Sequence, residues 1–139
     1  MRKILGLDLG SRTCGIAMSD SLGMIAHGVE TYHFKADDYD NCLEYITNII
    51  NDNDIKTVVL GLPKHMNGDI GIRADISIDF KEKLEKKNEG IEVILIDERL
   101  TTKLAENQLI FADVSRKKRK KVIDKMAAVA ILQGYLDSK

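Results

Sequence analysis

The pattern of apolar and polar positions divides the chain into a β-rich start and a remainder in which helices and strands alternate. At the start, apolar residues recur at every second position, which predicts strands. Three strands are expected at residues 3–9, 14–19 and 24–34, separated by tight turns at 10–13 and 20–23. Such short turns join antiparallel neighbours, so this part should form a three-strand meander.

Further along, apolar residues recur at steps of three and four, which predicts amphipathic helices. Helices are expected over 38–51, 72–87, 102–111 and 122–136, with Thr102 as the cap of the third. Apolar runs at 55–62 and 91–96 predict two more strands, and 63–71 predicts a loop that contains the only proline, Pro63. Helical crossovers make these two strands parallel to the first. The expected fold is an α/β domain with a five-stranded mixed sheet flanked by helices.

Length and composition fit one globular domain. The chain has 139 residues, of which 44% are hydrophobic, and it contains no internal repeat, low-complexity segment or linker. We therefore expect a single domain over residues 1–139.

Positive charge is concentrated in one segment. Residues 116–121 (Arg116, Lys117, Lys118, Arg119, Lys120 and Lys121) are six consecutive basic residues. Without them, 15 basic side chains stand against 22 acidic ones, and the net charge changes from −1 to −7. Because adjacent like charges repel, we expect this run to be mobile until it binds a polyanion. The alternative is a solvated helix end or loop.

Cysteine content and hydropathy indicate a cytoplasmic protein without a membrane segment. Cys14 and Cys42 lack metal-ligand spacing and fit reduced thiols. The opening apolar run is short and contains Asp8, so we expect no signal peptide. No apolar stretch approaches the length of a membrane span.

Asp8 is a carboxylate inside an apolar strand. Strand alternation places it on the face shared with Gly6 and Gly10, opposite Leu5 and Leu7. A buried charge is unfavourable unless it is paired or binds a metal, and flanking glycines leave room for a ligand. A hydrogen bond from the following turn to a strand-end carboxylate is the alternative.

Two further carboxylates are candidates to join Asp8. Glu98 follows the fifth predicted strand, and Asp124 lies at the start of a helix whose small residues permit close packing on a sheet. Three converging carboxylates form a site for a hard cation such as Mg²⁺, which can promote phosphodiester hydrolysis. Alternatively, Glu98 belongs to a solvated strand end, and Asp124 only stabilises a helix N-terminus.

Four other residues are candidates for contacts with nucleic acid. They are Arg12, Lys64, Asn67 and Arg99. Arg12 can equally stabilise its turn, Arg99 can pair with a neighbouring carboxylate, and the loop that carries Lys64 and Asn67 can be a plain surface loop. We rank Asp97 below Glu98 because alternation turns it to the opposite face. Asp20 fits a turn, and the three histidines show no ligand spacing.

Four ordered motifs resemble the YqgF family, also called RuvX, which groups Holliday junction resolvase-like proteins and proposed nucleases of pre-16S ribosomal RNA. The first motif is Gly6-Leu7-Asp8-Leu9-Gly10-Ser11-Arg12-Thr13-Cys14-Gly15-Ile16-Ala17. The others are Gly61-Leu62-Pro63 with Met66-Asn67-Gly68, then Asp97-Glu98-Arg99-Leu100-Thr101-Thr102, then Asp124-Lys125-Met126-Ala127-Ala128 with Ile131-Leu132 and Tyr135-Leu136. Lys64-His65 departs from the usual family loop, which leaves the loop contacts open.

The resemblance implies a ribonuclease H-like fold related to RuvC resolvases. It assigns Asp8, Glu98 and Asp124 as catalytic residues that bind Mg²⁺ or Mn²⁺. It implies a hydrolase that matures the 5′ end of pre-16S ribosomal RNA, with ribosomal particles among the partners. Resolution of four-way DNA junctions is the alternative, for which a homodimer would be suited.

Two other classes of protein are also considered. One is an ATPase of the actin and sugar-kinase type, whose phosphate loop resembles Asp8-Leu9-Gly10-Ser11, although such proteins need two domains of this kind. The other is a nucleic-acid-binding module without catalysis, which the presence of all three carboxylates disfavours.

Overall fold

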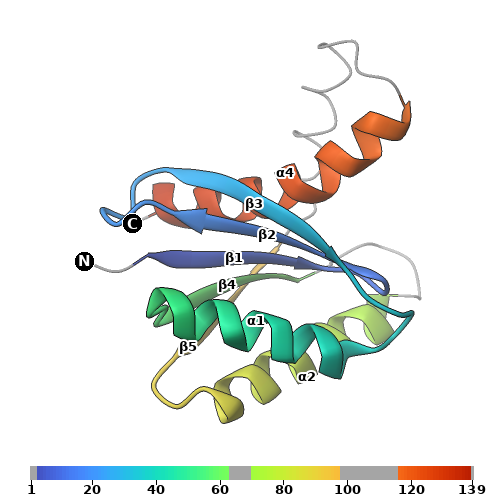
Figure 1. Ribbon diagram of the computed structural model, residues 1–139, viewed down its shortest axis with the longest axis horizontal. Helices are drawn as coiled ribbons and strands as arrows, with labels where there is room; N and C mark the ends of the chain where they lie inside the picture. The colour runs from blue at the N-terminus through green and yellow to red at the C-terminus, as the bar shows by residue number, and fades with distance from the viewer. Residues whose placement is uncertain (1–2, 63–69, 98–115, 139) are drawn as a thin grey trace.

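A five-stranded sheet forms the centre of the molecule (Figure 1). The computed structural model describes residues 3–62, 70–97 and 116–138, and within them all side chains except those of 70–73, 97 and 116–126. The strands are β1 (Ile4–Leu9), β2 (Thr13–Ser19), β3 (Ala26–His33), β4 (Thr57–Leu62) and β5 (Glu92–Asp97), in the spatial order β3-β2-β1-β4-β5. β1, β2 and β3 pair antiparallel, whereas β1, β4 and β5 pair parallel. The predicted mixed sheet is confirmed.

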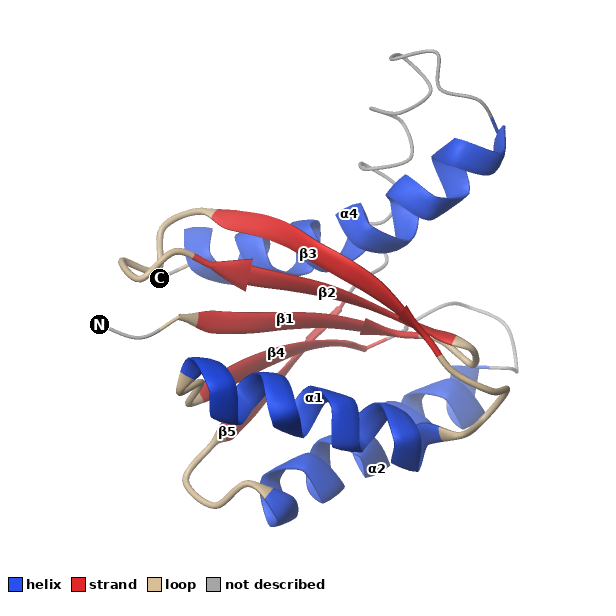
Figure 2. Cartoon of the chain, in the orientation of Figure 1, coloured by secondary structure: helices blue, strands red, loops and turns tan. Residues whose placement is uncertain are grey.

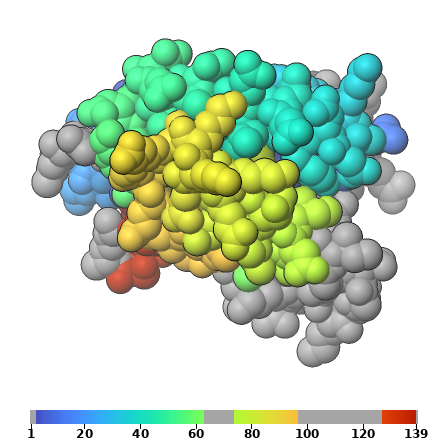
Figure 3. Space-filling model, turned by 90° about the horizontal axis from the view of Figure 1, so that it is seen from below, coloured from blue at the N-terminus to red at the C-terminus, as the bar shows by residue number. Residues whose placement is uncertain are grey.

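Helices cover both faces of the sheet. α1 (Tyr39–Asn53) and α2 (Ile70–Lys87) lie on one face, and α4 (Arg116–Asp137) lies on the other (Figures 1 and 2). Seen from below, α1 and α2 form a continuous surface over the sheet (Figure 3). The helix predicted over 102–111 lies outside the described residues. Within the described residues, no helix has the length and apolar character needed to cross a membrane.

The two faces of β1 contribute to separate cores, as the period of two predicts. Leu5, Leu7 and Leu9 pack in a cluster with apolar side chains of α1 and α2, including Ile46 and Leu84. Ile4 packs in a second cluster with Val59 of β4 and with Ala128, Ile131 and Leu132 of α4. The side of β1 that carries Gly6 and Asp8 therefore faces α4.

Local hydrogen bonds move several element ends from their predicted positions. α1 continues to Asn53 because Asp54 adopts a left-handed conformation, with φ of 51°, and its N–H donates to the Ile50 carbonyl. β3 begins at Ala26 because the Asp20 carboxylate accepts the N–H groups of Met24, at 2.8 Å, and Ile25, at 3.3 Å. These bonds lower the pKa of Asp20, which acts as a turn residue as predicted.

The start of α4 was predicted wrongly. The helix was expected at about residue 122, but it begins at Arg116 and includes the whole basic run. Arginine and lysine are good helix formers, and no glycine or proline interrupts residues 116–133. Repulsion between like charges costs only a few tenths of a kcal/mol per pair at helical spacing, which is too little to stop the helix. A helix end, given as the alternative for this run, is the arrangement observed.

Candidate active site

The carboxyl ends of the three parallel strands define one edge of the sheet. The register pairs Leu7 with Leu60 between β1 and β4, and Leu62 with Asp97 between β4 and β5. Asp8 is one residue beyond the last pair of β1 with β4, and Asp97 is the last residue of β5. Ligands of open α/β sheets bind at this edge. The candidate carboxylates of β1 and of the segment after β5 thus belong to the same edge by their position in the chain.

Asp8 is partly buried on the face of β1 that α4 covers. Across the antiparallel ladder it is paired with Gly15 of β2, and Gly6 precedes it on the same side of β1. Carboxylate oxygens are the donors that Mg²⁺ prefers, and Gly15 adds no side chain opposite this one. The residues present therefore fit a hard cation.

The charge of Asp8 also reaches the opposite face of the sheet. Cys14 and Cys42 are free, fully buried thiols. The pKa of Cys14 is raised well above its usual value, first by a hydrogen bond with the Cys42 thiol, then by burial, and also by the negative charge of Asp8. The Cys14 thiol is therefore protonated in the folded protein.

α4 approaches β1 closely at Gly6. A Cβ atom on this glycine would lie 2.7 Å from the Leu132 Cβ and 3.2 Å from the Ala128 carbonyl oxygen. Gln133, at the C-terminal end of α4, binds the start of β3, where its Oε1 accepts the Ala26 N–H at 2.9 Å. Ala26 pairs with Ser19, whose hydroxyl accepts the Ile4 N–H at 2.7 Å. α4 therefore runs antiparallel to β1.

The direction of α4 determines where position 124 lies relative to Asp8. Asp124 lies one helical turn before Ala128, on the stripe of α4 that also contains Leu132, and its side chain is outside the described set. A turn of helix advances about 5.4 Å, and two strand residues advance about 6.6 Å. From the contact at Gly6, one turn back along α4 reaches position 124, and two residues forward along β1 reach Asp8. Because the two elements are antiparallel, both steps lead toward the carboxyl end of β1. The backbone of α4 thus brings position 124 toward the same edge as Asp8.

The other predicted site residues are described only in part. Arg12 is exposed in the turn after β1. Glu98, Lys64, Asn67 and Arg99 lie outside the described residues, and for Asp97 only the backbone is described. Ile96 packs on the side of α4 and Leu95 on the side of α1 and α2. Among the residues that the structure describes, no group of three or more His, Cys, Asp or Glu side chains is placed to hold a metal ion.

The basic run occupies the first turns of α4. Residues 116–121 lie at the end of the helix farther from the Gln133 contact, and the ribbon of these turns projects away from the sheet (Figure 1). Their side chains are outside the described set. The run thus precedes position 124 on one continuous helix.

Comparison with known proteins shows which family the chain belongs to. The family model described as "RuvX: Holliday junction resolvase" matches residues 2–138. The chain belongs to the RuvX family. It is 55% identical over 136 residues to a Staphylococcus epidermidis protein, covering 98% of this chain and 96% of that protein. A Staphylococcus aureus protein is 53% identical over the same length and coverage. Both are named "Putative pre-16S rRNA nuclease".

Solved structures place this RuvX chain in the fold of RuvC-like resolvases. Thermus thermophilus RuvC in complex with a Holliday junction substrate superposes with a TM-score of 0.63 at 11% identity, over 99% of this chain and 95% of that one. The fowlpox virus Holliday junction resolvase gives a TM-score of 0.60 at 14% identity, with 99% of both chains covered. These likenesses confirm the ribonuclease H-like fold.

The close approach at Gly6 gives a first prediction, on stability. Gly6→Ala should destabilise the protein by about 1 to 3 kcal/mol, because its methyl group overlaps Leu132 and the backbone of α4. Gly134 lies on α4, and a Cβ added there would have nothing within 4 Å. Gly134→Ala should therefore stabilise the protein by about 0.5 to 1 kcal/mol, because alanine favours a helix more than glycine does. The free energy of unfolding of each variant, measured in urea, tests this prediction. Equal stabilities would show that α4 is not packed on β1 at this glycine.

Proposed function

We propose that this chain is a divalent-metal-dependent endonuclease whose main substrate is the 5′ leader of pre-16S ribosomal RNA. Membership of the RuvX family supports cleavage of nucleic acid. The substrate is supported by relatives that are 53% and 55% identical over nearly the whole chain and are named for pre-16S rRNA. The observation that carries the proposal is a carboxylate, Asp8, on the glycine-lined face of β1 against which α4 packs.

Asp8, Glu98 and Asp124 are the proposed ligands of Mg²⁺ or Mn²⁺. The antiparallel course of α4 supports Asp124, because it directs the helix from the contact at Gly6 toward the carboxyl end of β1. Strand alternation supports Glu98: Ile96 packs on the side of α4, and continuing the alternation by two residues gives the same side. By the same rule Asp97 falls on the opposite side and is not a proposed ligand.

The proposed chemistry is hydrolysis of a phosphodiester. A bound divalent cation lowers the pKa of a water molecule and stabilises the negative charge on the leaving oxygen. The three carboxylates fix the position of the cation, and Gly15, paired with Asp8 across the ladder, adds no side chain beside it. Arg12, exposed four residues after Asp8, holds a substrate phosphate, together with Lys64, Asn67 and Arg99.

A four-way DNA junction is the second candidate substrate. It is favoured by the family description and by the fold shared with a RuvC protein whose structure contains such a junction. Symmetric cutting of a junction requires two active sites, so this function is proposed only for a homodimer. The leader substrate instead places the enzyme in the cytoplasm on assembling ribosomal particles.

The test is cleavage by the purified protein. A uniformly labelled RNA that contains the 5′ leader and the start of mature 16S ribosomal RNA, and a labelled four-way DNA junction, are incubated separately with Mg²⁺ or Mn²⁺. We expect discrete cuts in the leader, no cuts in EDTA, and slower or absent cutting of the junction. Preferential, symmetric cutting of the junction would replace the first substrate by the second. Tight binding of both without any cut would contradict the enzyme and favour a non-catalytic binding module.

A further inference from the structure

The face of the sheet that carries Asp8 continues across β2 to the end of β3. The register pairs Asp8 with Gly15 and Gly15 with Thr31, so these residues share the face that α4 covers. Two residues further along β3, His33 pairs with Thr13 on the same face, and its side chain is exposed. The spacing of strands and of residues along them puts the Cα atoms of Asp8 and His33 about 12 Å apart. A nucleic-acid strand bound at Asp8 can therefore reach His33 with a neighbouring phosphate.

Arg12 lies beside this end of β3. Its carbonyl accepts the Phe34 N–H at 2.9 Å, which joins the turn after β1 to the residue that follows β3. The side chains of Arg12, His33 and Lys35 are exposed, and none of the three forms an ion pair with another described residue. We call these three residues the basic edge. They present unpaired hydrogen-bond donors next to the candidate active site.

The acidic residues that follow the basic edge have local partners at the start of α1. The Asp38 carboxylate caps α1 by accepting the Asn41 N–H at 3.3 Å. The Asp37 carboxylate accepts the Tyr39 hydroxyl at 3.2 Å. These carboxylates are thus engaged with α1 and not with the basic edge.

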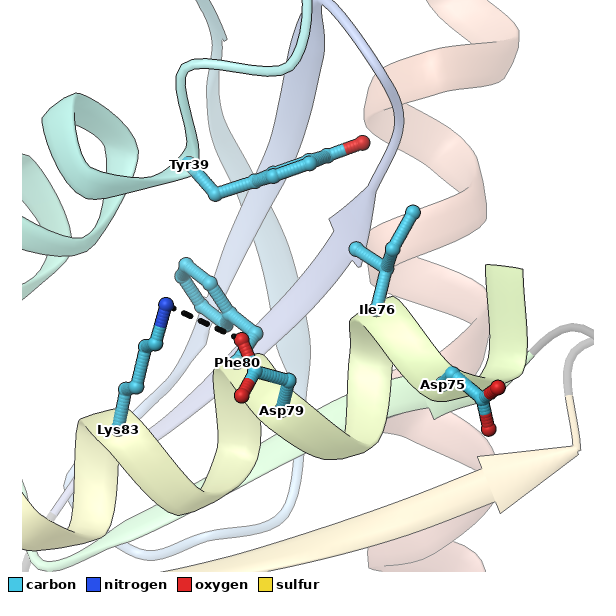
Figure 4. A pocket seen from close by; sticks show the side chains of 6 residues that line it. All are labelled: Tyr39, Asp75, Ile76, Asp79, Phe80 and Lys83. Atoms are coloured by element: carbon cyan, nitrogen blue, oxygen red, sulfur yellow. Dashed lines mark ion pairs between the residues drawn. The ribbon is translucent and has the colours of Figure 1, made fainter. Parts of the chain in front are cut away.

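The opposite face of the sheet is unsuited to a polyanion. Between Ala36 and Asp54, which includes all of α1, the chain has six acidic residues and no lysine, arginine or histidine. On the neighbouring α2, the Lys83 Nζ lies 3.1 Å from an Asp79 oxygen (Figure 4) and 3.9 Å from an Asp40 oxygen of α1. Nucleic acid is therefore repelled by the α1 side and attracted by the basic edge.

We propose that His33 and Lys35, together with Arg12, bind neighbouring phosphates of the substrate strand beside the proposed metal site. Imidazole and ammonium N–H groups donate to phosphate oxygens, and such contacts fix the position of a strand without reading its bases. The strand then passes from Asp8 toward the end of β3. This inference rests on the proposed nuclease function and adds two substrate-binding residues that the sequence motifs do not single out.

The test is binding of RNA by the full chain in EDTA, where no cleavage is expected. The probe is a fluorescein-labelled single-stranded RNA from the 5′ leader of pre-16S ribosomal RNA, and anisotropy gives the Kd at several salt concentrations. His33→Gln and Lys35→Gln should each weaken binding by about three- to tenfold, as expected for the loss of one hydrogen bond to a phosphate. Lys35→Gln should also flatten the log–log salt dependence by about 0.7 units.

Two matched variants separate these contacts from general effects of the substitutions. His27 is also exposed on β3, but its partner on β2 packs on the α1 side of the sheet. His27→Gln, and Lys86→Gln near the end of α2, should change the Kd by less than about twofold, because these side chains lie away from the bound strand. Equal losses for His33→Gln and His27→Gln, or an unchanged Kd for both His33→Gln and Lys35→Gln, would overturn the proposal.

Neutral linkages in the RNA test whether His33 contacts a phosphate near the cut. One phosphate at a time is replaced by a methylphosphonate, and His33→Gln should lose no further affinity at a position close to the mapped cleavage site. Full additional losses at every position would contradict the phosphate contact. RNA that is bound but never cut in Mg²⁺ or Mn²⁺ would contradict the nuclease, whereas the comparison of His33 with His27 would still decide whether the basic edge binds the strand.

Discussion

Replacing Asp8 by asparagine is expected to abolish cleavage while the folded structure is retained. The amide is almost the same size as the carboxylate, but it lacks the anionic oxygen that a hard cation prefers. Loss of a ligand removes several kcal/mol of transition-state stabilisation, so the rate should fall by roughly 10³-fold or more. The measurement is the single-turnover cleavage rate at saturating metal, with thermal unfolding followed in parallel.

The control for this variant is a matched substitution elsewhere. Asp52→Asn removes an exposed carboxylate of α1 and should leave cleavage unchanged. Glu98→Gln and Asp124→Asn should resemble Asp8→Asn. Wild-type turnover of the Asp8 variant would exclude this residue as a ligand, and a loss of activity in Asp97→Asn but not in Glu98→Gln would reverse the choice between these neighbours.

Neutralising the basic run should weaken nucleic-acid binding strongly and reduce its dependence on salt. Six consecutive helical residues are distributed around the whole circumference of α4, since each advances by about 100°. Only about three of them can face one ligand. Each phosphate contact contributes a log–log slope of about −0.9 on duplex and −0.7 on single strands, so replacing all six by glutamine should flatten the slope by about 2 to 3 units. All sequences should lose affinity alike, because phosphate contacts do not read bases.

The helical geometry also predicts which positions of the run are important. Positions 117 and 121 lie on the stripe of α4 that continues through 124 to Ala128, whereas 116 and 119 lie on the far side. Lys117→Gln with Lys121→Gln should flatten the slope by about 1.5 units, or two contacts, and Arg116→Gln with Arg119→Gln should change it by less than half as much. Equal slopes for wild type and the sixfold variant would show that the run lies away from the substrate.

The sheet could be predicted from the sequence because side-chain alternation is a local property. Leu5, Leu7 and Leu9 pack on one side of β1 and Ile4 on the other, as the period of two requires. Helix ends were less predictable. The end of α1 depends on a left-handed Asp54, and the start of α4 on the helix propensity of residues expected to repel one another. These local energies compete within about 1 kcal/mol.

The candidate site was predictable only in part, for a physical reason. Asp8 could be singled out because a carboxylate is rare in a glycine-bordered apolar strand. The contact of Leu132 with Gly6 and the direction of α4 depend on packing between segments more than 100 residues apart. Only the structure shows this contact and the direction of the helix.

The central claim is that Asp8, Glu98 and Asp124 surround one metal site, and iron-directed cleavage of the protein tests it most directly. Fe²⁺ replaces Mg²⁺ in the folded chain, and ascorbate with hydrogen peroxide then generates radicals that cut the nearby backbone. Mass spectrometry of the fragments should give three cuts, near residues 8, 98 and 124, that are suppressed by excess Mg²⁺ and absent in Asp8→Asn. Cuts at only one of these segments, or at the acidic residues of α1 instead, would contradict the account.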